Sequence, residues 1–338
     1  MVVDYTYDGG AGREPARPSA AGTAALSNFQ SHLTHFTGAL IEVCFTGPGQ
    51  FMVHQTQAQL PRIRLVDIRE MMPRIARFSV AAERTTALFA TGADPNQFCD
   101  GVKLGPRDVI LLHGCDGPLH HRTQGPGNWG MIAVEQAVLI AHCQALTGSS
   151  AALPQDRAIL QPTWSAAARL RQLHAKICNL AARTPSILSH SEAARALENE
   201  VLHALVNCLV GSGRHVPRQR RHIEIVNAFE RVLTRRLSEP LTVTWISAEI
   251  GVPERTLRAC CLDILGMSPS RYLRLRRLNM VRAALQHANP APGAITELAR
   301  RYGFSELGRF ATSYRQTFGE APSATLRGRP QAIARSPV

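Results

Sequence analysis

The sequence contains almost no lysine. Only Lys103 and Lys176 stand among its 38 basic residues, so 38 − 2 = 36 of them are arginine. No run approaches the roughly 18 consecutive apolar residues that a membrane-spanning helix needs, which argues against a membrane protein. Residues 1–22 carry acids and no apolar core, so they do not resemble a signal peptide. We therefore expect a cytoplasmic protein.

Motifs for catalysis and metal binding are also missing. The chain has no GxGxxG, P-loop, GxSxG or HExxH motif, and the acids of residues 1–213 are scattered singly. None of its eight cysteines forms a CxxC pair, the spacing typical of zinc ribbons, and without export they are expected to be reduced. The sequence thus predicts no enzyme, no catalytic residue, no bound metal and no cofactor.

Nearly all of the positive charge lies in the last third of the chain. Residues 214–338 contain 21 arginines and nine acids, a net charge of 21 − 9 = +12 out of +13 for all 338 residues. An arginine-rich segment beside a nearly neutral one indicates nucleic-acid binding, because neutralised phosphates release counterions. A general preference for arginine over lysine explains the ratio of the two residues but not this asymmetry.

The first part of the chain predicts a β-rich domain. Residues 1–25 are rich in Gly, Ala, Pro and Arg and predict a disordered tail. Residues 26–145 contain short β segments between Gly- and Pro-containing turns, which favours an antiparallel barrel or sandwich. The expected strands are Ala39–Phe45, Phe51–Gln57, Ile63–Ile68, Ile75–Val80, Thr86–Ala90, Val109–Leu112 and Met131–Val134.

Residues 161–211 predict a helical hairpin. Apolar residues recur at helical spacing in two stripes. The first stripe is Leu170, Leu173, Ile177 and Leu180, and the second is Leu197, Val201, Leu205 and Leu209. These stripes either close the β-rich domain or pair with a second subunit, and the sequence favours neither. Residues 211–220 predict a linker because they contain Gly, Pro and Arg, and residues 328–338 predict a second tail.

Two segments beyond the linker repeat one pattern. Trp245–Val252 is followed by a helical stretch over Glu254–Leu265, and Ile295–Phe304 is followed by Ser305–Phe318. Gly251 and Gly303 suit the left-handed residue of a tight turn between two helices. Ala248 and Ala299 are small enough to let the two helices cross closely. Each segment therefore predicts a helix-turn-helix unit, whose second helix can enter a major groove of DNA.

Residues 223–327 resemble the DNA-binding domain of the AraC/XylS family of transcription regulators. The most specific likeness is Arg301-Tyr302-Gly303-Phe304-Ser305, then Phe310, Tyr314-Arg315, Phe318-Gly319 and Pro322. Earlier matches are Thr256-Leu257-Arg258, Leu265-Gly266-Met267-Ser268-Pro269, Tyr272 and Arg276-Arg277-Leu278. The resemblance implies an all-α domain over residues 221–327, in which a long helix, Pro269–Leu285, joins two helix-turn-helix units.

The resemblance also implies which residues contact DNA. The recognition helices would be Glu254–Leu262 and Glu306–Gln316, placed in successive major-groove segments. The base-facing residues would be Arg255, Thr256, Arg258 and Ala259 in the first helix, and Leu307, Gly308, Arg309 and Thr312 in the second. The arginines among them are expected to read bases, because a guanidinium can bind guanine O6 and N7 together. Phosphate contacts, or pairing with neighbouring acids, are expected for Arg271, Arg274, Arg276 and Arg277.

The sequence departs from the family at several of these positions. Many relatives carry arginine where Ala259 and Thr312 stand, so some usual DNA contacts are missing. Pro253 replaces the serine that often caps the first recognition helix, and the capping oxygen is lost with it. Cys260 and Cys261 stand where an apolar pair usually packs, and we expect them to be small core residues.

A group of histidines in the β-rich part has no role in this scheme. His113, Cys115, His120 and His121 lie within nine positions, and cupin-like barrels often hold metals. We expect a turn with solvated histidines there rather than a metal site, because spacing alone does not make imidazoles and a thiolate converge.

The sequence therefore predicts a multi-domain α+β transcription regulator. A β-rich, cupin-like sensory domain, loosely similar to that of ethanolamine-type regulators of the family, would bind a small-molecule effector and control an all-α DNA-binding domain. The expected partners are double-stranded DNA, RNA polymerase and the effector, with a homodimer as a further assembly. Two alternatives stay open: a metal-dependent cupin-like enzyme fused to a DNA-binding module, and an architectural protein that binds DNA without sequence preference.

Overall fold

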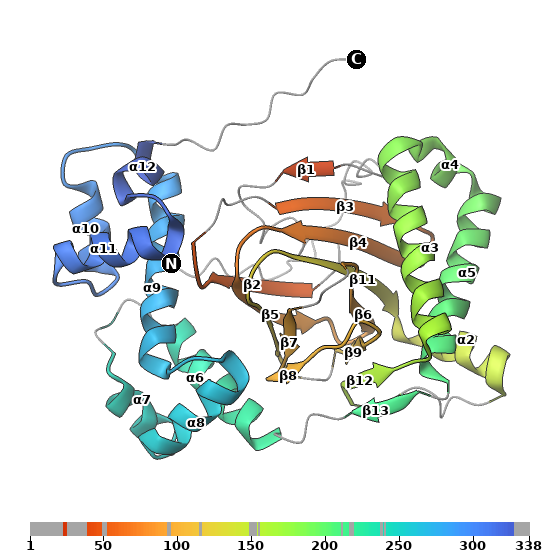
Figure 1. The fold of residues 1–338 in the computed structure, drawn as a ribbon, viewed down its shortest axis with the longest axis horizontal. Helices are drawn as coiled ribbons and strands as arrows, with labels where there is room; N and C mark the ends of the chain where they lie inside the picture. The colour runs from red at the N-terminus through yellow and green to blue at the C-terminus, as the bar shows by residue number, and fades with distance from the viewer. Residues whose placement is uncertain are drawn as a thin grey trace, which may run out of the picture.

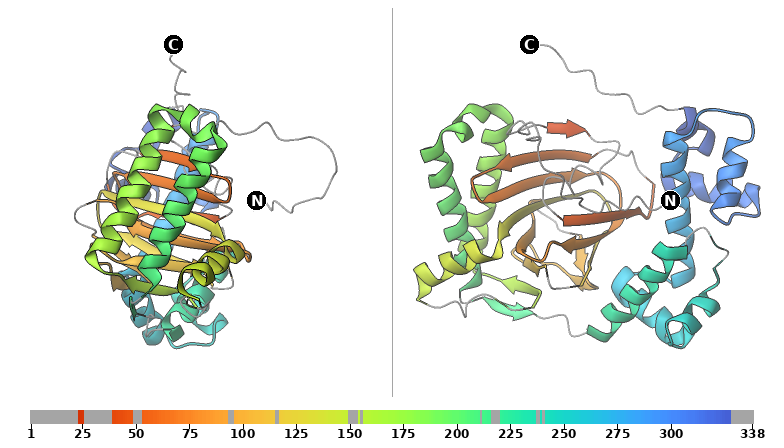
Figure 2. Two further views of the ribbon diagram at one scale, coloured as in Figure 1. Left: turned by 90° about the vertical axis from the view of Figure 1, so that its right-hand side faces the viewer. Right: turned by 180° about the vertical axis from the view of Figure 1, so that it is seen from behind.

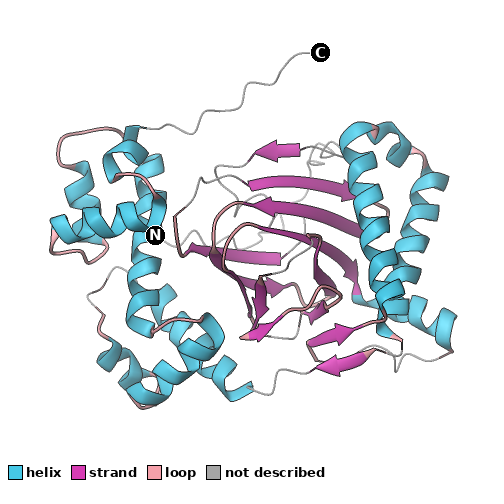
Figure 3. Cartoon of the chain, in the orientation of Figure 1, coloured by secondary structure: helices cyan, strands magenta, loops and turns pink. Residues whose placement is uncertain are grey.

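A computed structural model describes most of the chain between residues 23 and 327. The described ranges are 23–25, 39–48, 53–92, 96–114, 117–148, 154, 156–210, 212–215, 220–236, 239 and 241–327. Residues 1–22 and 328–338, which contain most of the two expected tails, lie outside them. Sheets occupy the N-terminal half and helices the C-terminal half (Figures 1 and 3).

The β-rich part consists of two antiparallel sheets. The larger has the strand order β1-β3-β4-β11-β6-β9-β12-β13, and the smaller has the order β2-β5-β10-β7-β8. The strands are β1 (Thr23–Ala25), β2 (Ala39–Phe45), β3 (Val53–Gln59), β4 (Ile63–Glu70), β5 (Arg74–Val80), β6 (Arg84–Ala90), β7 (Gln97–Cys99), β8 (Val102–Lys103), β9 (Val109–His113), β10 (Leu119–Thr123), β11 (Gly127–Glu135), β12 (Ala158–Gln161) and β13 (Gly213–His215). Apolar side chains from both sheets, among them Ile68, Phe78 and Trp129, form one core cluster.

All seven expected strands are present, and their ends differ from the prediction by a few residues. The sequence did not predict β1, β7, β8, β10, β12 or β13, which are short. β1 lies within residues 1–25, the range expected to be a disordered tail, and pairs with β3, so the end of that range belongs to the larger sheet. The larger sheet continues beyond residue 145, since β12 pairs with β9. β13 lies within the range expected to be a linker and pairs with β12, so part of that range belongs to the sheet.

The described helices are α2 (Gln136–Thr147), α3 (Trp164–Arg183), α4 (Pro185–Ser189), α5 (Ser191–Leu209), α6 (Arg220–Arg236), α7 (Val243–Glu249), α8 (Glu254–Leu265), α9 (Pro269–His287), α10 (Ala294–Arg301), α11 (Leu307–Phe318) and α12 (Pro322–Arg327). None of them is both long and apolar enough to cross a membrane. Polar side chains cap three of these helices, because Thr163, Thr242 and Ser268 each accept a hydrogen bond from a backbone N–H in the first turn of α3, α7 and α9.

Helices α3 and α5 lie side by side across one face of the larger sheet (Figure 2). Their apolar stripes, apart from the partly buried Leu180, belong to or pack against the same core cluster as Leu65, Phe89 and Ile132 of the sheet. Leu170, Ile177, Val201 and Leu205 are completely buried there without a second subunit. The stripes therefore pack against the larger sheet and close the β-rich part, which is the first of the two alternatives expected for the hairpin.

The helical part is built around α9, with α6, α7 and α8 near one end and α10, α11 and α12 near the other (Figure 1). One core cluster runs through all of it and includes Phe229, Leu257, Leu278 and Tyr314. The same cluster includes Cys44 and two other buried side chains of the β-rich part, so the two parts of the chain share a packed contact.

Candidate nucleic-acid interface

Two helix pairs in the helical part make the same turn. We call α7 with α8 the first helix pair and α10 with α11 the second. Gly251 and Gly303 have φ of +69° and +83°, the left-handed conformation expected from the sequence. The N–H of the next residue reaches back across each turn: Val252 N donates to Ser247 O at 3.0 Å, and Phe304 N donates to Ala299 O at 2.9 Å.

These matching hydrogen bonds show that Ala248 does not have the role expected for it, that of the small residue where the two helices cross. Ser247 occupies the position that corresponds to Ala299, and both are buried, whereas Ala248 is exposed. The small residue where the first two helices cross is therefore Ser247. The prediction was wrong by one position because it compared alanine with alanine instead of counting back from the glycine of each turn.

Helix α8 presents a polar face to solvent and an apolar face to the core. Arg255, Arg258 and Ala259 are exposed and Thr256 is partly buried. Cys260 and Cys261 are completely buried in the core cluster, as expected. Pro253 precedes the helix and provides no side-chain cap, also as expected. The exposed face therefore carries two guanidinium groups on adjacent turns of one helix.

Helix α11 offers less polar chemistry. Gly308, Arg309 and Thr312 are exposed, whereas Leu307 is partly buried against the core. Arg309 pairs with Glu306 at 3.0 Å, and the Thr312 hydroxyl donates to the Gly308 carbonyl at 3.0 Å. A surface pair of this kind is weak, about 1 kcal/mol or less, so it leaves the Arg309 guanidinium free to exchange partners.

The four arginines of α9 for which phosphate contacts or acid pairing were expected lie in different surroundings. Arg271 and Arg274 are exposed, as a phosphate contact requires. Arg277 donates to the Glu239 carbonyl at 2.7 Å. Arg276 faces the β-rich part, where it pairs with Glu42 at 3.5 Å and its side chain is 13% exposed. Of the two roles expected for Arg276, the structure therefore favours pairing with an acid over contact with phosphate.

The expected turn with solvated histidines is wrong. His113, His120 and His121 are 1%, 0% and 2% exposed, because they lie on β9 and β10 rather than in a turn. His121 contacts Arg74, and His120 is covered by α6, where it lies 3.9 Å from Glu230. Among the described residues, no three His, Cys, Asp or Glu side chains are grouped to hold a metal. Cys115 lies outside the described residues.

A second polar feature, which the sequence analysis missed, lies inside the β-rich part. Arg74 is completely buried, with its Nε 3.0 Å from Glu70 Oε2 and its Nη1 2.8 Å from the His121 carbonyl. Burial raises the pKa of Glu70 even though Arg74 opposes this. Burial and the Arg74 charge lower the pKa of His121 well below its usual value. The signal in the sequence was a pair of opposite charges, Glu70 and Arg74, at the two ends of a turn between apolar strands.

Comparisons with known proteins agree with the geometry of the helical part. Residues 246–328 match the helix-turn-helix domain family. Over 95 residues, 28% of this chain, the sequence is 41% identical to the probable thc operon regulatory protein of Rhodococcus erythropolis, and the match covers 29% of that protein. Over 105 residues, 30% of this chain, it is 50% identical to the XylDLEGF operon transcriptional activator 1 of Pseudomonas putida, and the match covers 32% of that protein.

A solved structure of a probable AraC family transcriptional regulator from Rhodopseudomonas palustris is also similar. It is 33% identical, with a TM-score of 0.29, and the match covers 32% of this chain and 99% of that chain. The chain thus spans less than a third of the length of each curated relative, 29% of the first and 32% of the second. The matches cover 28% and 30% of this chain. The C-terminal region over residues 246–328 is therefore a helix-turn-helix domain of the AraC/XylS type of transcription regulator.

Proposed function

We propose that the protein is a sequence-specific DNA-binding transcription regulator with two helix-turn-helix units, the first and the second helix pair. The observation that carries this proposal is the repeated turn at Gly251 and Gly303, within the region that matches a helix-turn-helix domain. Each turn leads into a helix that exposes arginine, Arg255 and Arg258 on α8 and Arg309 on α11. The Pseudomonas relative is named a transcriptional activator, and we propose that this chain also activates transcription.

The length of α9 supports readout of two grooves. Its 19 residues span about 28 Å at 1.5 Å per residue. The helix pairs lie near opposite ends of α9 (Figure 1), and the length of that helix is similar to one helical turn of DNA, about 34 Å. Both recognition helices can then enter successive major-groove segments on one face of the duplex.

We propose further that the cupin-like β-rich part binds a small-molecule effector in the buried polar region around Arg74. Gln55 supports this, because its side-chain amide is 2% exposed and neither its nitrogen nor its oxygen has a hydrogen-bond partner among the described residues. In the strand register Gln55 lies opposite Ile68, which in turn lies opposite Trp129, so the three face the same side of the larger sheet. A buried amide without partners is costly, and a polar ligand would satisfy it.

Selection of binding sites from a random duplex library at near-physiological salt tests the regulator proposal. We expect enrichment of a site with two short blocks about one helical turn apart. Binding should weaken as salt rises, with log affinity falling by about 0.9 per phosphate neutralised for each unit of log salt. Salt-sensitive binding without any enriched site would contradict the proposal and favour an architectural DNA-binding protein.

A further inference from the structure

The two helix pairs are joined mainly through α9. Among the described helices, the main contacts lie within a first group, α6 to α8, within a second group, α10 to α12, and between each group and α9 (Figure 1). Packed helices can shift relative to one another by small sliding movements. The orientation of the first helix pair relative to the second therefore depends on how each group is held on α9.

One side chain of α9 contacts both groups. Arg277 stands near the middle of the helix, as the ninth of its 19 residues. Its Nη2 donates a hydrogen bond to the Glu239 carbonyl at 2.7 Å, in the segment between α6 and α7. A Cβ added to Gly303 would lie 3.2 Å from the Arg277 Cζ, 3.4 Å from its Nη1 and 3.5 Å from its Nε. The face of the guanidinium therefore covers the turn of the second helix pair.

This contact is not part of the turn that the two helix pairs share. A Cβ added to Gly251, the corresponding glycine of the first pair, would meet no described atom within 4 Å. Both glycines have the same left-handed backbone, so the turn itself needs no guanidinium over it. The contact of Arg277 with Gly303 therefore belongs to the joint between the two groups rather than to the helix-turn-helix unit.

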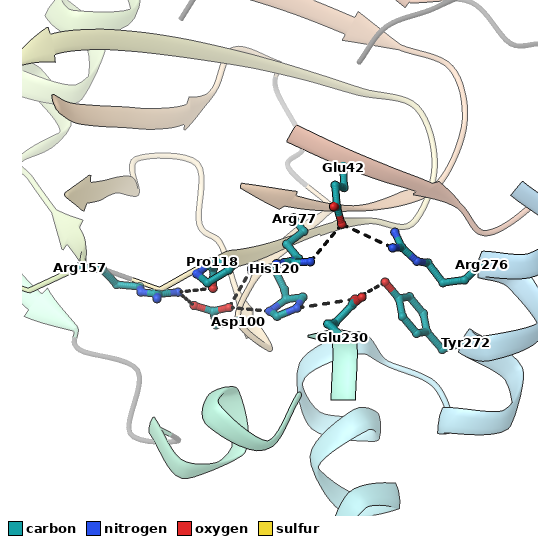
Figure 4. Close-up of polar contacts among 9 residues, drawn as sticks. All are labelled: Glu42, Arg77, Asp100, Pro118, His120, Arg157, Glu230, Tyr272 and Arg276. Atoms are coloured by element: carbon teal, nitrogen blue, oxygen red, sulfur yellow. Dashed lines mark hydrogen bonds and ion pairs between the residues drawn. The ribbon is translucent and has the colours of Figure 1, made fainter. Parts of the chain in front are cut away.

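Neighbouring arginines of α9 have partners on one side only. Arg276 faces β2, where it pairs with Glu42 at 3.5 Å (Figure 4). Arg282 pairs at 3.3 Å with Glu320, which follows α11 in the second group. Arg277 differs from both, because it contacts the first group through Glu239 and the second group through Gly303.

A guanidinium is costly in this position. The Nε of Arg277 is buried without a hydrogen-bond partner among the described residues, and burial lowers the pKa of the side chain. An apolar side chain would fill the same space without desolvating a charge. What arginine adds is a rigid planar group, which donates from one edge to a carbonyl and packs with its face against a backbone turn. The surroundings of Arg277 use both of these properties.

We propose that Arg277 is a positioning residue for DNA recognition, which fixes the orientation of the first helix pair relative to the second. The proposal deepens the proposed function and rests on it, since it concerns how α8 and α11 reach two groove segments together. Without Arg277 each pair would keep its own fold, but ordering the two pairs on one duplex would cost free energy during binding. Such preorganisation raises the affinity for a site with both blocks and not for a single block.

Contact with a phosphate is the other role open to Arg277. A phosphate contact predicts a similar loss of affinity on every duplex and a salt slope that falls by about one. The positioning role predicts a loss that depends on the presence and spacing of both blocks. Arg277→Lys separates the two roles, because lysine keeps a charge for a phosphate but has no planar face to cover Gly303.

The DNA experiment compares the full chain with its Arg277→Lys and Arg274→Ala variants at one salt concentration. The duplexes are the selected site, the same site with one block scrambled, and the site with one base pair inserted between the blocks. We expect Arg277→Lys to bind the selected site about 10-fold more weakly and the single-block duplex less than about two-fold more weakly. Its penalty for the inserted base pair should be smaller than that of the wild type, because loosened helix pairs adapt to the new spacing.

Arg274→Ala is the matched control on the same helix. Arg274 is exposed, and a phosphate contact there predicts similar losses on all three duplexes. The same pattern in Arg277→Lys, or wild-type affinity on every duplex, would overturn the positioning role. Urea denaturation of each variant shows that its helical part is folded.

A distance measurement tests the same role without DNA. Spin labels at Leu262→Cys on α8 and Gln316→Cys on α11, two exposed positions, report the separation of the recognition helices by double electron–electron resonance. The seven described cysteines are buried, and Cys115 would be replaced by serine. We expect Arg277→Lys to make the distance distribution about two-fold broader or more, and Arg274→Ala to leave it unchanged. A distribution of wild-type width in Arg277→Lys would contradict the proposal.

The two experiments distinguish a failure of this proposal from a failure of the proposed function. A wild-type protein that binds all three duplexes equally would contradict two-groove recognition, while the width of the distance distribution still decides whether Arg277 holds the two pairs in place. A wild-type protein that discriminates among the duplexes, together with an Arg277→Lys variant that matches it in affinity and in width, would overturn the positioning role alone.

Discussion

At the scale of single residues, we expect the exposed arginines of α8 to contact bases and the exposed arginines of α9 to contact phosphates. Arg258→Ala should cost about 1–3 kcal/mol of binding free energy on the selected site and much less on random DNA, because it removes a contact to a base. The measurement is a fluorescence titration of both duplexes at one salt concentration. Arg274→Ala is the control, since a phosphate contact predicts similar losses on both duplexes. Equal losses for Arg258→Ala would make it a phosphate contact as well.

Gly303 tests the geometry of the second turn. With φ at +83°, any side chain is strained there, and a Cβ would lie 3.2 Å from the Arg277 guanidinium carbon. Gly303→Val should therefore lower the free energy of unfolding of the helical part by about 1–3 kcal/mol. Urea denaturation followed by circular dichroism measures this. Gly125→Val is the control, because a Cβ at Gly125 meets no atom within 4 Å. A variant with wild-type stability would refute the role assigned to the turn.

At the scale of elements, Asn279 joins α9 to the edge strand β2. Asn279→Ala removes the side-chain amide from the N–H and C=O of Phe45, so docking should weaken and Cys44 should be alkylated about five-fold faster at constant pH. The comparison is with Asn207→Ala, since Asn207 is exposed on α5. Unchanged Cys44 reactivity in Asn279→Ala would show that the two parts stay together without the hydrogen bonds from Asn279.

The elements that could be predicted from the sequence are those with local signals. The helix pairs follow from amphipathic spacing and from a glycine that only a left-handed turn explains. Strands such as Ala39–Phe45 follow from apolar runs between turn residues. Each of these signals lies within one short segment of the sequence, so the elements can be predicted without knowledge of tertiary contacts.

The elements that were mispredicted depend on distant contacts. β10 has the sequence LHHRT, which contains two histidines and an arginine and has the composition of a solvated turn. It is buried because one side faces Arg74 and the other is covered by α6 and α8. Glu230 was missed for the same reason: on its own helix it is one acid among several, and only the docked β-rich part buries it.

At the scale of the whole molecule, buried histidines make the fold sensitive to acid. Burial lowers the pKa of His121 and His174, so both are neutral in the folded protein. In the unfolded chain they bind protons below their ordinary value of 6.5. Stability is therefore present above about pH 6.5 and falls as the pH drops below it, by at most about 1.4 kcal/mol per histidine for each pH unit.

Urea denaturation at pH 7.5 and 5.5 checks this dependence. Loss of stability on acidification is expected in the transition that reports the β-rich part. His174→Gln should reduce the loss, because glutamine keeps a donor for the Val66 carbonyl but does not titrate. Equal stability at the two pH values would contradict the neutral state of these histidines.

The central claim is that one molecule reads two successive major-groove segments through α8 and α11. The most direct measurement is the affinity of the full chain for its selected site and for the same site with five base pairs inserted between the two blocks. Five base pairs rotate one block by about half a turn and move it out of reach of the second helix pair. The account predicts an affinity loss of at least about 100-fold, close to the loss from scrambling one block. Unchanged affinity after the insertion would contradict two-groove readout.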